Sequence, residues 1–270
     1  MYSGTTLKGS RHFDAWFGAH QKIDRTARRH LEVLLPGTSF PRRRNIVRFE
    51  GLDGPDGIKR KTPAQDEPWH YFDPADENDT QLLDIIDSHY HHLVVALREK
   101  NNVRAGFEAA WLAHAIVDGL TPAHHYPYEE ELIRLRGGAG IETRTTAKEK
   151  VVMPGDTLPQ MLSHNWQMWG DKGLLSTHIA FEIGIAVISM PLRLGRALPN
   201  DEDVRRVEHI GHRELFVERA KQIDELQMYQ QFYQSGWTPK LLSIVRRRLM
   251  PKIVNTVTLI WYSAAREAEK

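Results

Sequence analysis

The segment from Phe107 to Tyr128 constrains the fold of this chain more than any other. Its first half places four residues on one helical face, at i, i+4, i+7 and i+11: Phe107, Trp111, His114 and Asp118. An unpaired carboxylate on a buried face is costly, so Asp118 requires a partner. The sequence therefore predicts a buried helix that carries an imidazole and a carboxylate one turn apart.

The second half of this segment adds further histidines. Thr121-Pro122 ends the helix, and His124 and His125 follow where the chain can turn back toward the same face. Two interpretations are open. The histidines and the aspartate either converge on a borderline metal such as zinc, or form an ordinary His–Asp pair in the core beside solvated loop histidines.

Apolar residues recur at helical spacing along most of the chain, whereas no stretch alternates between apolar and polar residues as a strand would. The predicted helices cover approximately residues 11–35, 81–100, 107–120, 129–135, 158–169, 173–190, 202–234 (as one long helix or two) and 239–268. No internal repeat or domain linker is evident. The sequence predicts one all-α domain spanning residues 1–270, with an irregular arm at 1–10 and an exposed excursion at 136–158.

Residues 36–80 are rich in proline, glycine and aspartate and lack helical spacing. A segment of this length without secondary structure is usually functional or disordered. Two clusters of aromatic and acidic residues, at 49–56 and 69–74, favour an ordered loop that covers another part of the molecule.

Composition excludes several classes of protein. A net charge of +1 provides no bulk attraction for nucleic acid or an anionic membrane, and the basic runs Arg42–Arg44 and Arg246–Arg248 are interpreted as solvated faces. The absence of cysteine excludes disulfides and thiolate metal sites. The chain shows no secretory signal and no apolar run of transmembrane length, so we expect a cytoplasmic protein without a membrane span. No sequence signal specifies an oligomeric state.

Three further patterns extend the central one. His178 and Glu182 form a second i,i+4 imidazole–carboxylate pair, on the helix predicted at 173–190. His20 lies on the apolar stripe of the first helix, whereas His30 lies among arginines and is expected to be exposed. His70 lies between Trp69 and Tyr71, which is an unusual setting for a solvated histidine.

Together these residues resemble the zinc-dependent phospholipase C and S1/P1 nuclease superfamily, over approximately residues 15–185. The family's His-x3-Asp-x5-His pattern, with proline two before the last histidine, is similar to His114, Asp118, Pro122 and His124. Its His-aromatic-aromatic-Asp-Pro element is similar to residues 70–74, and Asp56 occupies the expected place fourteen residues before His70. The later His-x3-Glu pair looks like His178 and Glu182, and the early helical histidine looks like His20.

The resemblance implies an all-α fold with two or three zinc ions. One ion would be held by four side chains: Asp56, His70, His114 and Asp118. A neighbouring ion would be held by His20, with Asp118 as a bridging ligand, and a further ion by His124, His178 and Glu182. Neutral imidazole ligands need hydrogen-bond acceptors behind them, for which Asp53, Glu67 and Asp73 are candidates.

The sequence departs from the family at specific places. Secreted members complete the metal at the first histidine with a processed N-terminal tryptophan, whereas Trp16 lies within this chain, four residues before His20. That metal position is then absent, weakly held, or completed by His12 or by a free N-terminus folded back. Gly57 follows Asp56 where an aromatic choline-binding residue is expected, which disfavours phosphatidylcholine as substrate. His125 competes with His124, and the spacing favours His124.

The resemblance predicts a metal-dependent phosphoesterase that hydrolyses phosphodiesters with a metal-bound hydroxide. Asp56 is then a ligand, the general base, or both. The substrate would be a phospholipid head group or a nucleotide. The alternatives are a single-strand nuclease or nucleotidase of the same fold, for which Trp69, Tyr71, Trp166 and Trp169 are candidate base platforms, and a metal-binding homologue without turnover. The small net charge weighs against a nuclease.

Overall fold

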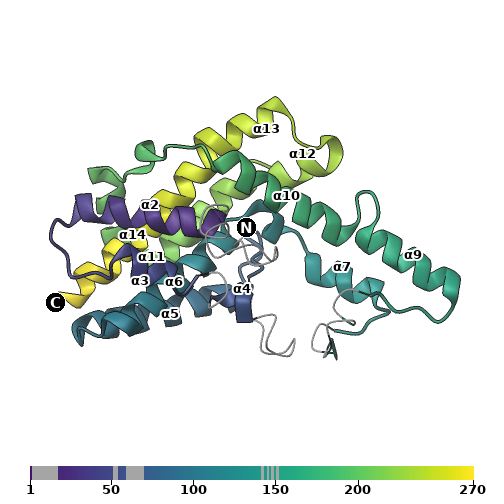
Figure 1. Cartoon of the computed structure of the whole chain (residues 1–270), viewed down its shortest axis with the longest axis horizontal. Coiled ribbons are helices and arrows are strands. Elements are labelled where there is room, and N and C mark those ends of the chain that lie inside the picture. The colour runs from purple at the N-terminus through teal and green to yellow at the C-terminus, as the bar shows by residue number, and fades with distance from the viewer. Residues whose placement is uncertain are drawn as a thin grey trace.

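The computed structural model describes residues 1, 18–50, 54–58, 70–140, 143–144, 146, 149 and 152–270. Within these residues every regular element is a helix, and the chain forms one domain (Figure 1). The elements are α2 (Ala19–Leu34), α3 (Arg43–Val47), α4 (Pro55–Ile58), α5 (Gln81–Arg98), α6 (Asn102–Gly119), η3 (Pro122–His125), α7 (Tyr128–Leu135), α9 (Leu158–Trp169), α10 (Leu174–Ser189), η5 (Gly195–Ala197), α11 (Asp201–Asp224), α12 (Met228–Ser235), α13 (Pro239–Ile244), the π-helical η6 (Val245–Leu249) and α14 (Met250–Ala268).

The core of the bundle is organised around α14, which packs against α2, α5, α6 and α11. Trp261 on α14 is completely buried, and its indole N–H donates to the carbonyl oxygen of Ala109 on α6 at 3.1 Å. Its ring also contacts Phe40, at 5.4 Å between centroids. Helix α14 therefore fixes α2 and α6, which carry two of the histidines singled out in the sequence.

Helix α6 ends where its sequence predicts but begins five residues earlier, at Asn102 rather than Phe107. The side chain of Asn101 accepts a hydrogen bond from the backbone N–H of Arg104 and caps the first turn. The helix ends at Gly119, and η3 follows after Thr121, with Pro122 at its first position. This tight turn holds η3 against the C-terminal end of α6.

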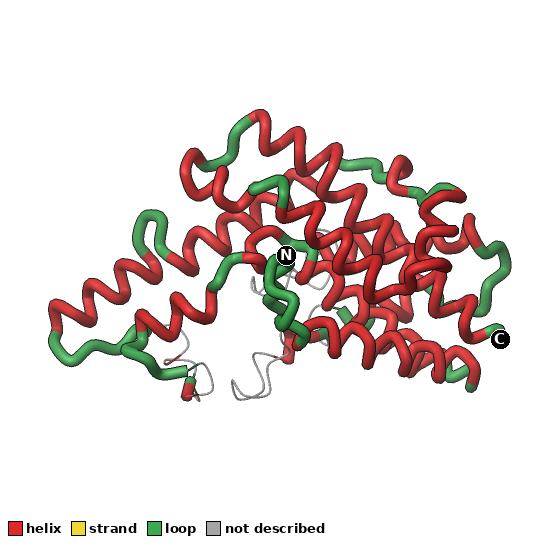
Figure 2. The backbone as a smooth tube through the Cα atoms, turned by 180° about the vertical axis from the view of Figure 1, so that it is seen from behind, coloured by secondary structure: helices red, strands yellow, loops and turns green. Residues whose placement is uncertain are grey.

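Helices α7 and α9 form an arm that extends from the bundle in both views (Figures 1 and 2). By length and composition, Leu158–Ser189 is apolar enough to cross a membrane, although 39% of its most apolar window is buried. The structure divides this stretch into α9, with 12 residues, and α10, with 16 residues. Both are shorter than the roughly 20 residues that a spanning helix needs.

The predicted helices agree with the observed ones except within residues 36–80 and at the start of α6. Residues 36–80 contain two short helices, α3 and α4, which are too brief to show a periodic pattern. The pattern at 202–234 corresponds to two helices, α11 and α12, and Gly211 with a φ of 86° bends α11. The first part of the helix predicted at 11–35 lies outside the described residues.

The packing at the end of α6 generates a stability prediction. A Cβ atom at Gly119 would lie 2.5 Å from Cδ2 of Leu82 and 2.5 Å from Cζ of Phe216. Gly119→Ala is therefore expected to lower the free energy of unfolding by about 1–3 kcal/mol in urea denaturation. Gly195→Ala is the control, because nothing lies within 4 Å of its Cβ, and we expect a change below about 0.5 kcal/mol. Equal effects of the two substitutions would contradict this packing.

Candidate metal centre

The carboxylate of Asp118 lies at the centre of a buried group of nitrogen and oxygen atoms. Nε2 of His114, one turn earlier on α6, lies 3.1 Å from Oδ2, and Nε2 of His20 at the start of α2 lies 3.3 Å from Oδ1. The two imidazole rings stack with their centroids 4.3 Å apart. Asp56 of α4 approaches the same place, with Oδ1 3.8 Å from Nε2 of His114. We call these four residues the Asp118 cluster.

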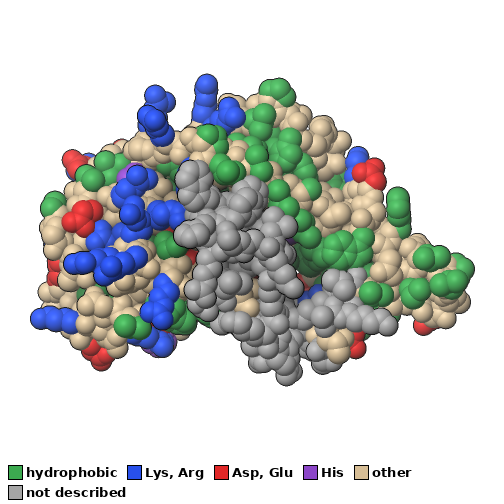
Figure 3. Space-filling model, in the orientation of Figure 1, with side chains coloured by type: hydrophobic (Ala, Val, Ile, Leu, Met, Phe, Trp, Pro, Cys, Tyr) green, Lys and Arg blue, Asp and Glu red, His purple; other side chains and the backbone are tan. Residues whose placement is uncertain are grey.

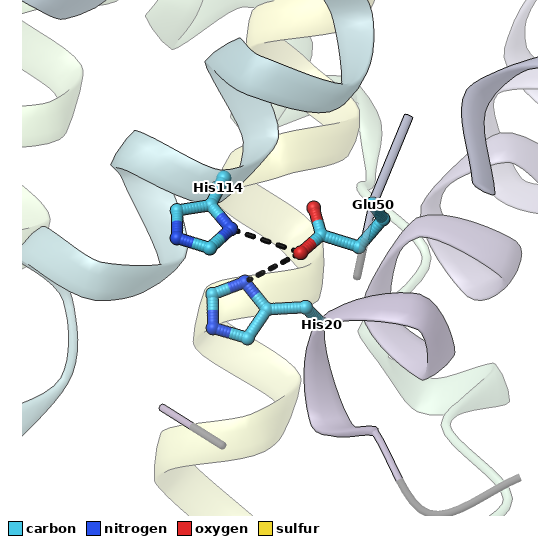
Figure 4. Close-up of side chains that lie close together, drawn as sticks. All are labelled: His20, Glu50 and His114. Carbon is cyan, nitrogen blue, oxygen red and sulfur yellow. Dashed lines mark hydrogen bonds and ion pairs between the residues drawn. The ribbon is translucent and has the colours of Figure 1, made fainter. Parts of the chain in front are cut away.

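Glu50 lies behind both histidines and was not singled out in the sequence. Its Oε1 accepts a hydrogen bond from Nδ1 of His114 at 2.9 Å and lies 4.0 Å from Nδ1 of His20 (Figure 4). Both imidazoles therefore direct Nδ1 toward Glu50 and Nε2 toward Asp118. This is the arrangement by which a carboxylate orients a metal-binding histidine.

Asp24 lies four residues after His20 and is also buried. Burial, followed by the negative charge of Glu50, raises the pKa of Asp24 well above its usual value. A protonated Asp24 avoids placing a second uncompensated charge beside Glu50. The i,i+4 spacing of His20 and Asp24 is the sequence signal that would have revealed it.

A second group, the Glu182 cluster, consists of His124, His178 and Glu182. Oε1 of Glu182 lies 2.9 Å from Nε2 of His124 and 3.3 Å from Nε2 of His178. The two imidazole rings are stacked, with centroids 5.1 Å apart. Nδ1 of His124 donates to the carbonyl oxygen of His70 at 3.0 Å, which leaves Nε2 directed at Glu182. The turn from α6 into η3 thus brings His124 to the pair on α10.

The backbone of Met1 joins the two clusters. Its amino nitrogen lies 2.7 Å from Oδ1 of Asp118 and 2.9 Å from Oε1 of Glu182. Its carbonyl oxygen accepts a hydrogen bond from Nε2 of His20 at 2.7 Å. The amine and the carbonyl of Met1 therefore both lie beside the candidate ligands, and His12, the other residue considered for this position, lies outside the described residues.

The charges in the site are strongly coupled. Burial lowers the pKa of the Met1 amino group, but Asp118 and Glu182 together raise it to about 10. Burial opposes ionisation of Asp118, yet the Met1 amino group and His114 hold the pKa of this carboxyl well below its usual value. Burial also opposes protonation of His114, but Glu50, Asp118 and Asp56 raise its pKa well above normal. The buried carboxylates thus create a position of strong negative potential that a cation stabilises.

Three predicted positions need separate comment. The ring of His70 lies near the Glu182 cluster, with its centroid 5.8 Å from that of His124. His125 points away, because its Nε2 donates to the carbonyl oxygen of Gly119 at 2.8 Å. The exposed Asp73 accepts a hydrogen bond from the backbone N–H of Ala75, so it forms a local turn and does not support a histidine.

The remaining candidates for supporting the histidines, Asp53 and Glu67, lie outside the described residues, as does Trp69. The acceptors found in the structure are Glu50, behind His114, and the backbone carbonyl of His70, behind His124. A backbone carbonyl cannot be read as an acceptor from side-chain identity. The acceptor behind His124 therefore leaves no signal in the sequence.

The donor atoms match the requirements of zinc. Nε2 of His114 is buried without a hydrogen-bond partner, although it lies close to two carboxylates, and Nδ1 of His178 is also buried without one. Each cluster offers imidazole nitrogens and carboxylate oxygens, which are ligands that zinc prefers. Two groups each bring their donor atoms within 4.8 Å of one another: His20, Glu50 and His114 form one, and the Glu182 cluster forms the other.

Comparison with known proteins does not add a family assignment. No protein-family model, no curated protein and no solved structure matches this chain. What the chain does must therefore be inferred from the site itself.

The contacts of Glu50 predict its effect on metal binding. Glu50→Gln replaces the acceptor behind His114 by a neutral amide and should weaken zinc binding about 10- to 100-fold. Competition with a chromophoric chelator measures this affinity. The exposed Glu99→Gln is the matched control and should retain full affinity. Unchanged affinity in Glu50→Gln would show that this carboxylate does not orient the ligands.

The environment of His124 predicts the acid stability of the metal-free protein. Burial, followed by the charge of the Met1 amino group, lowers the pKa of His124 from 6.5 to about 4. The unfolded chain therefore binds a proton between these pH values that the folded chain does not, so stability falls as the pH decreases from 6.5 to 4. His124→Gln should flatten this part of the pH profile of unfolding.

The exposed His209 provides the control, because His209→Gln should leave the profile as steep as in the wild type. An unchanged acid slope in His124→Gln would show that His124 is accessible to protons in the folded state.

Proposed function

We propose that this chain is a zinc-dependent phosphoesterase of the phospholipase C and S1/P1 nuclease type. The observation that carries the proposal is the convergence of seven side chains and the Met1 backbone from separate helices on two adjacent clusters. The clusters adjoin closely, since Nδ1 of His124 lies 3.9 Å from Oδ1 of Asp118. Four of these side chains form two i,i+4 pairs on helices, which holds each pair on one helical face.

The Asp118 cluster would hold zinc through Nε2 of His20 and of His114, with Asp118 between them and Asp56 nearby. His124, His178 and Glu182 would hold a further ion. When bound, zinc would neutralise phosphoryl oxygens and lower the pKa of a water molecule. The resemblance implies His70 as a further ligand, and its ring centroid lies 5.8 Å from that of His124, where the two clusters adjoin.

Asp56 is the residue best placed for proton transfer. Its side chain is 19% exposed, whereas that of Asp118 is only 3% exposed. A general base must contact both the site and the incoming water. Asp118 is enclosed by histidines and the Met1 amino group, so it serves to hold the cluster together.

A phospholipid head group is the substrate class that the surface supports best. Four exposed hydrophobic residues follow one face of α9, at i, i+4, i+8 and i+11: Leu158, Leu162, Trp166 and Trp169. They lie on the arm that protrudes from the bundle (Figure 3), and α9 contains no charged residue. An uncharged stripe with two tryptophans suits the interface of a lipid aggregate better than a phosphate backbone.

A single-strand nuclease or nucleotidase is the second candidate. Trp166 is 68% exposed and Trp169 is 41% exposed, so both are available for base stacking. Cations that would follow a nucleic-acid backbone are absent from α9 itself. Cleavage of single-stranded DNA in preference to short-chain phospholipids would reverse this ranking.

The proposal predicts metal-dependent turnover. Zinc-loaded protein should hydrolyse bis-p-nitrophenyl phosphate or p-nitrophenyl phosphorylcholine, and Asp118→Asn should reduce the rate by at least about 100-fold because it disrupts the carboxylate shared by the cluster. The exposed Asp76→Asn is the control and should retain the wild-type rate. Wild-type protein that retains zinc but turns over no member of a broad phosphoester panel would be a metal-binding protein without this activity.

A further inference from the structure

A cavity of about 1010 Å³ lies on the opposite face of α2 from His20. It is bounded by α2, by the start of α3 and by the segment that follows α10. Positions 22, 26, 29 and 33 of α2 line it, whereas His20 and Ile23 face the interior. We call this cavity the α2 groove. The thickness of one helix separates it from the metal centre.

The charged residues that line the α2 groove are all cationic: Lys22, Arg25, Arg29, Arg43 and Arg193. No aspartate or glutamate lines it among the residues that the structure describes. Arg29, Arg43 and Arg193 are exposed and form no ion pair with a described carboxylate. In Figure 3, lysine and arginine side chains gather over the region of α2 and α3. This is a concentrated positive potential on a chain whose net charge is only +1.

His30 also lines the groove and contradicts its sequence-based prediction. It was expected to be exposed among arginines, but it is only 8% exposed. Arg29 of α2 is exposed, whereas Arg28 is itself buried, and the imidazole of His30 borders the groove. Its Nδ1 is buried without a hydrogen-bond partner. A buried polar atom without a partner is uncommon in a native structure, and the imidazole that carries it borders the groove.

The groups of the groove repel one another. Burial and then the charge of Arg29 lower the pKa of His30, so its imidazole is neutral and has one N–H to donate. Burial also lowers the pKa of Arg25; Asp24 offsets this partly, and Arg43 and Arg29 lower it further. An anion that entered the groove would relieve this repulsion.

The other lining residues identify the kind of anion. Among the described residues, no phenylalanine, tyrosine or tryptophan lines the groove, so it lacks the large aromatic platforms that stack nucleobases. Arginine guanidinium groups instead match the geometry of phosphate oxygens. Because five cations converge from three segments, a ligand with several adjacent phosphate groups would gain more than one with a single charge.

We propose that the α2 groove is a binding site for a ligand with clustered phosphate groups, held by Arg29, Arg43 and Arg193 and by His30. The ligand is either a small soluble polyphosphate or the polyphosphorylated head group of a lipid, since both present the same chemistry. This site is separate from the proposed phosphoesterase centre and does not depend on its activity.

The test is calorimetric titration of the full chain with tripolyphosphate at physiological ionic strength. Arg29→Gln/Arg43→Gln/Arg193→Gln should weaken binding by roughly tenfold or more, because it removes three charge-assisted contacts. The matched control is Arg246→Gln/Arg247→Gln/Arg248→Gln, which removes the same charge from another exposed run and should bind as the wild type does. His30→Phe, which keeps a ring but removes both nitrogens, should also weaken binding.

Equal weakening in both triple variants would show attraction to net charge alone and would overturn the proposal. Binding that is absent in the wild type would overturn the proposal as well. So would binding that is unchanged in the groove variant, which is the result expected if tripolyphosphate binds only at the metal centre. Co-sedimentation with phosphatidylcholine vesicles containing a bisphosphorylated phosphatidylinositol distinguishes the two sources. Vesicle binding that the groove variant loses assigns a lipid head group, whereas tripolyphosphate binding alone assigns a soluble ligand.

Discussion

The carboxylate of Asp118 is the constraint on which the rest of the site depends. It is 2% exposed, and a buried carboxylate is tolerated only with compensating charge and hydrogen bonds. The compensation comes from groups distant in sequence, including His20 on α2 and the amino group of Met1. Helices α2 and α6 must therefore pack in one register, and the burial of Trp261 between α14 and α6 helps to enforce it.

The same constraint explains why further buried acidic residues lie behind the histidines that surround Asp118. Glu50 holds the outer nitrogen of His114, and its charge in turn raises the pKa of the neighbouring Asp24. Nε2 of His20 and Nε2 of His114 are thereby directed inward, toward Asp118. Such an arrangement favours a bound cation over a purely structural hydrogen-bond network, because Nε2 of His114 has no hydrogen-bond partner. The function that we propose follows from this preference of the site for a bound cation.

Local patterns predicted the parts of the site that local geometry determines. His114 with Asp118, and His178 with Glu182, are one turn apart on helices, so spacing alone placed each pair on one face. Proline at the start of η3 likewise indicated where His124 would lie. Glu50 is 64 residues from His114 and could not be paired with it by spacing. The exposure of His30 was predicted wrongly. Its neighbours in the sequence are arginines, but in the folded chain it also lies beside the segment that follows α10.

The metal content of the purified protein tests the central claim most directly. Plasma mass spectrometry should find about two to three zinc ions per chain in the wild type, because each cluster supplies imidazole and carboxylate donors. His114→Ala should lose the metal of the Asp118 cluster and retain that of the Glu182 cluster. Protein that contains no zinc, and takes up none when zinc is added, would contradict the assignment of these clusters as metal sites.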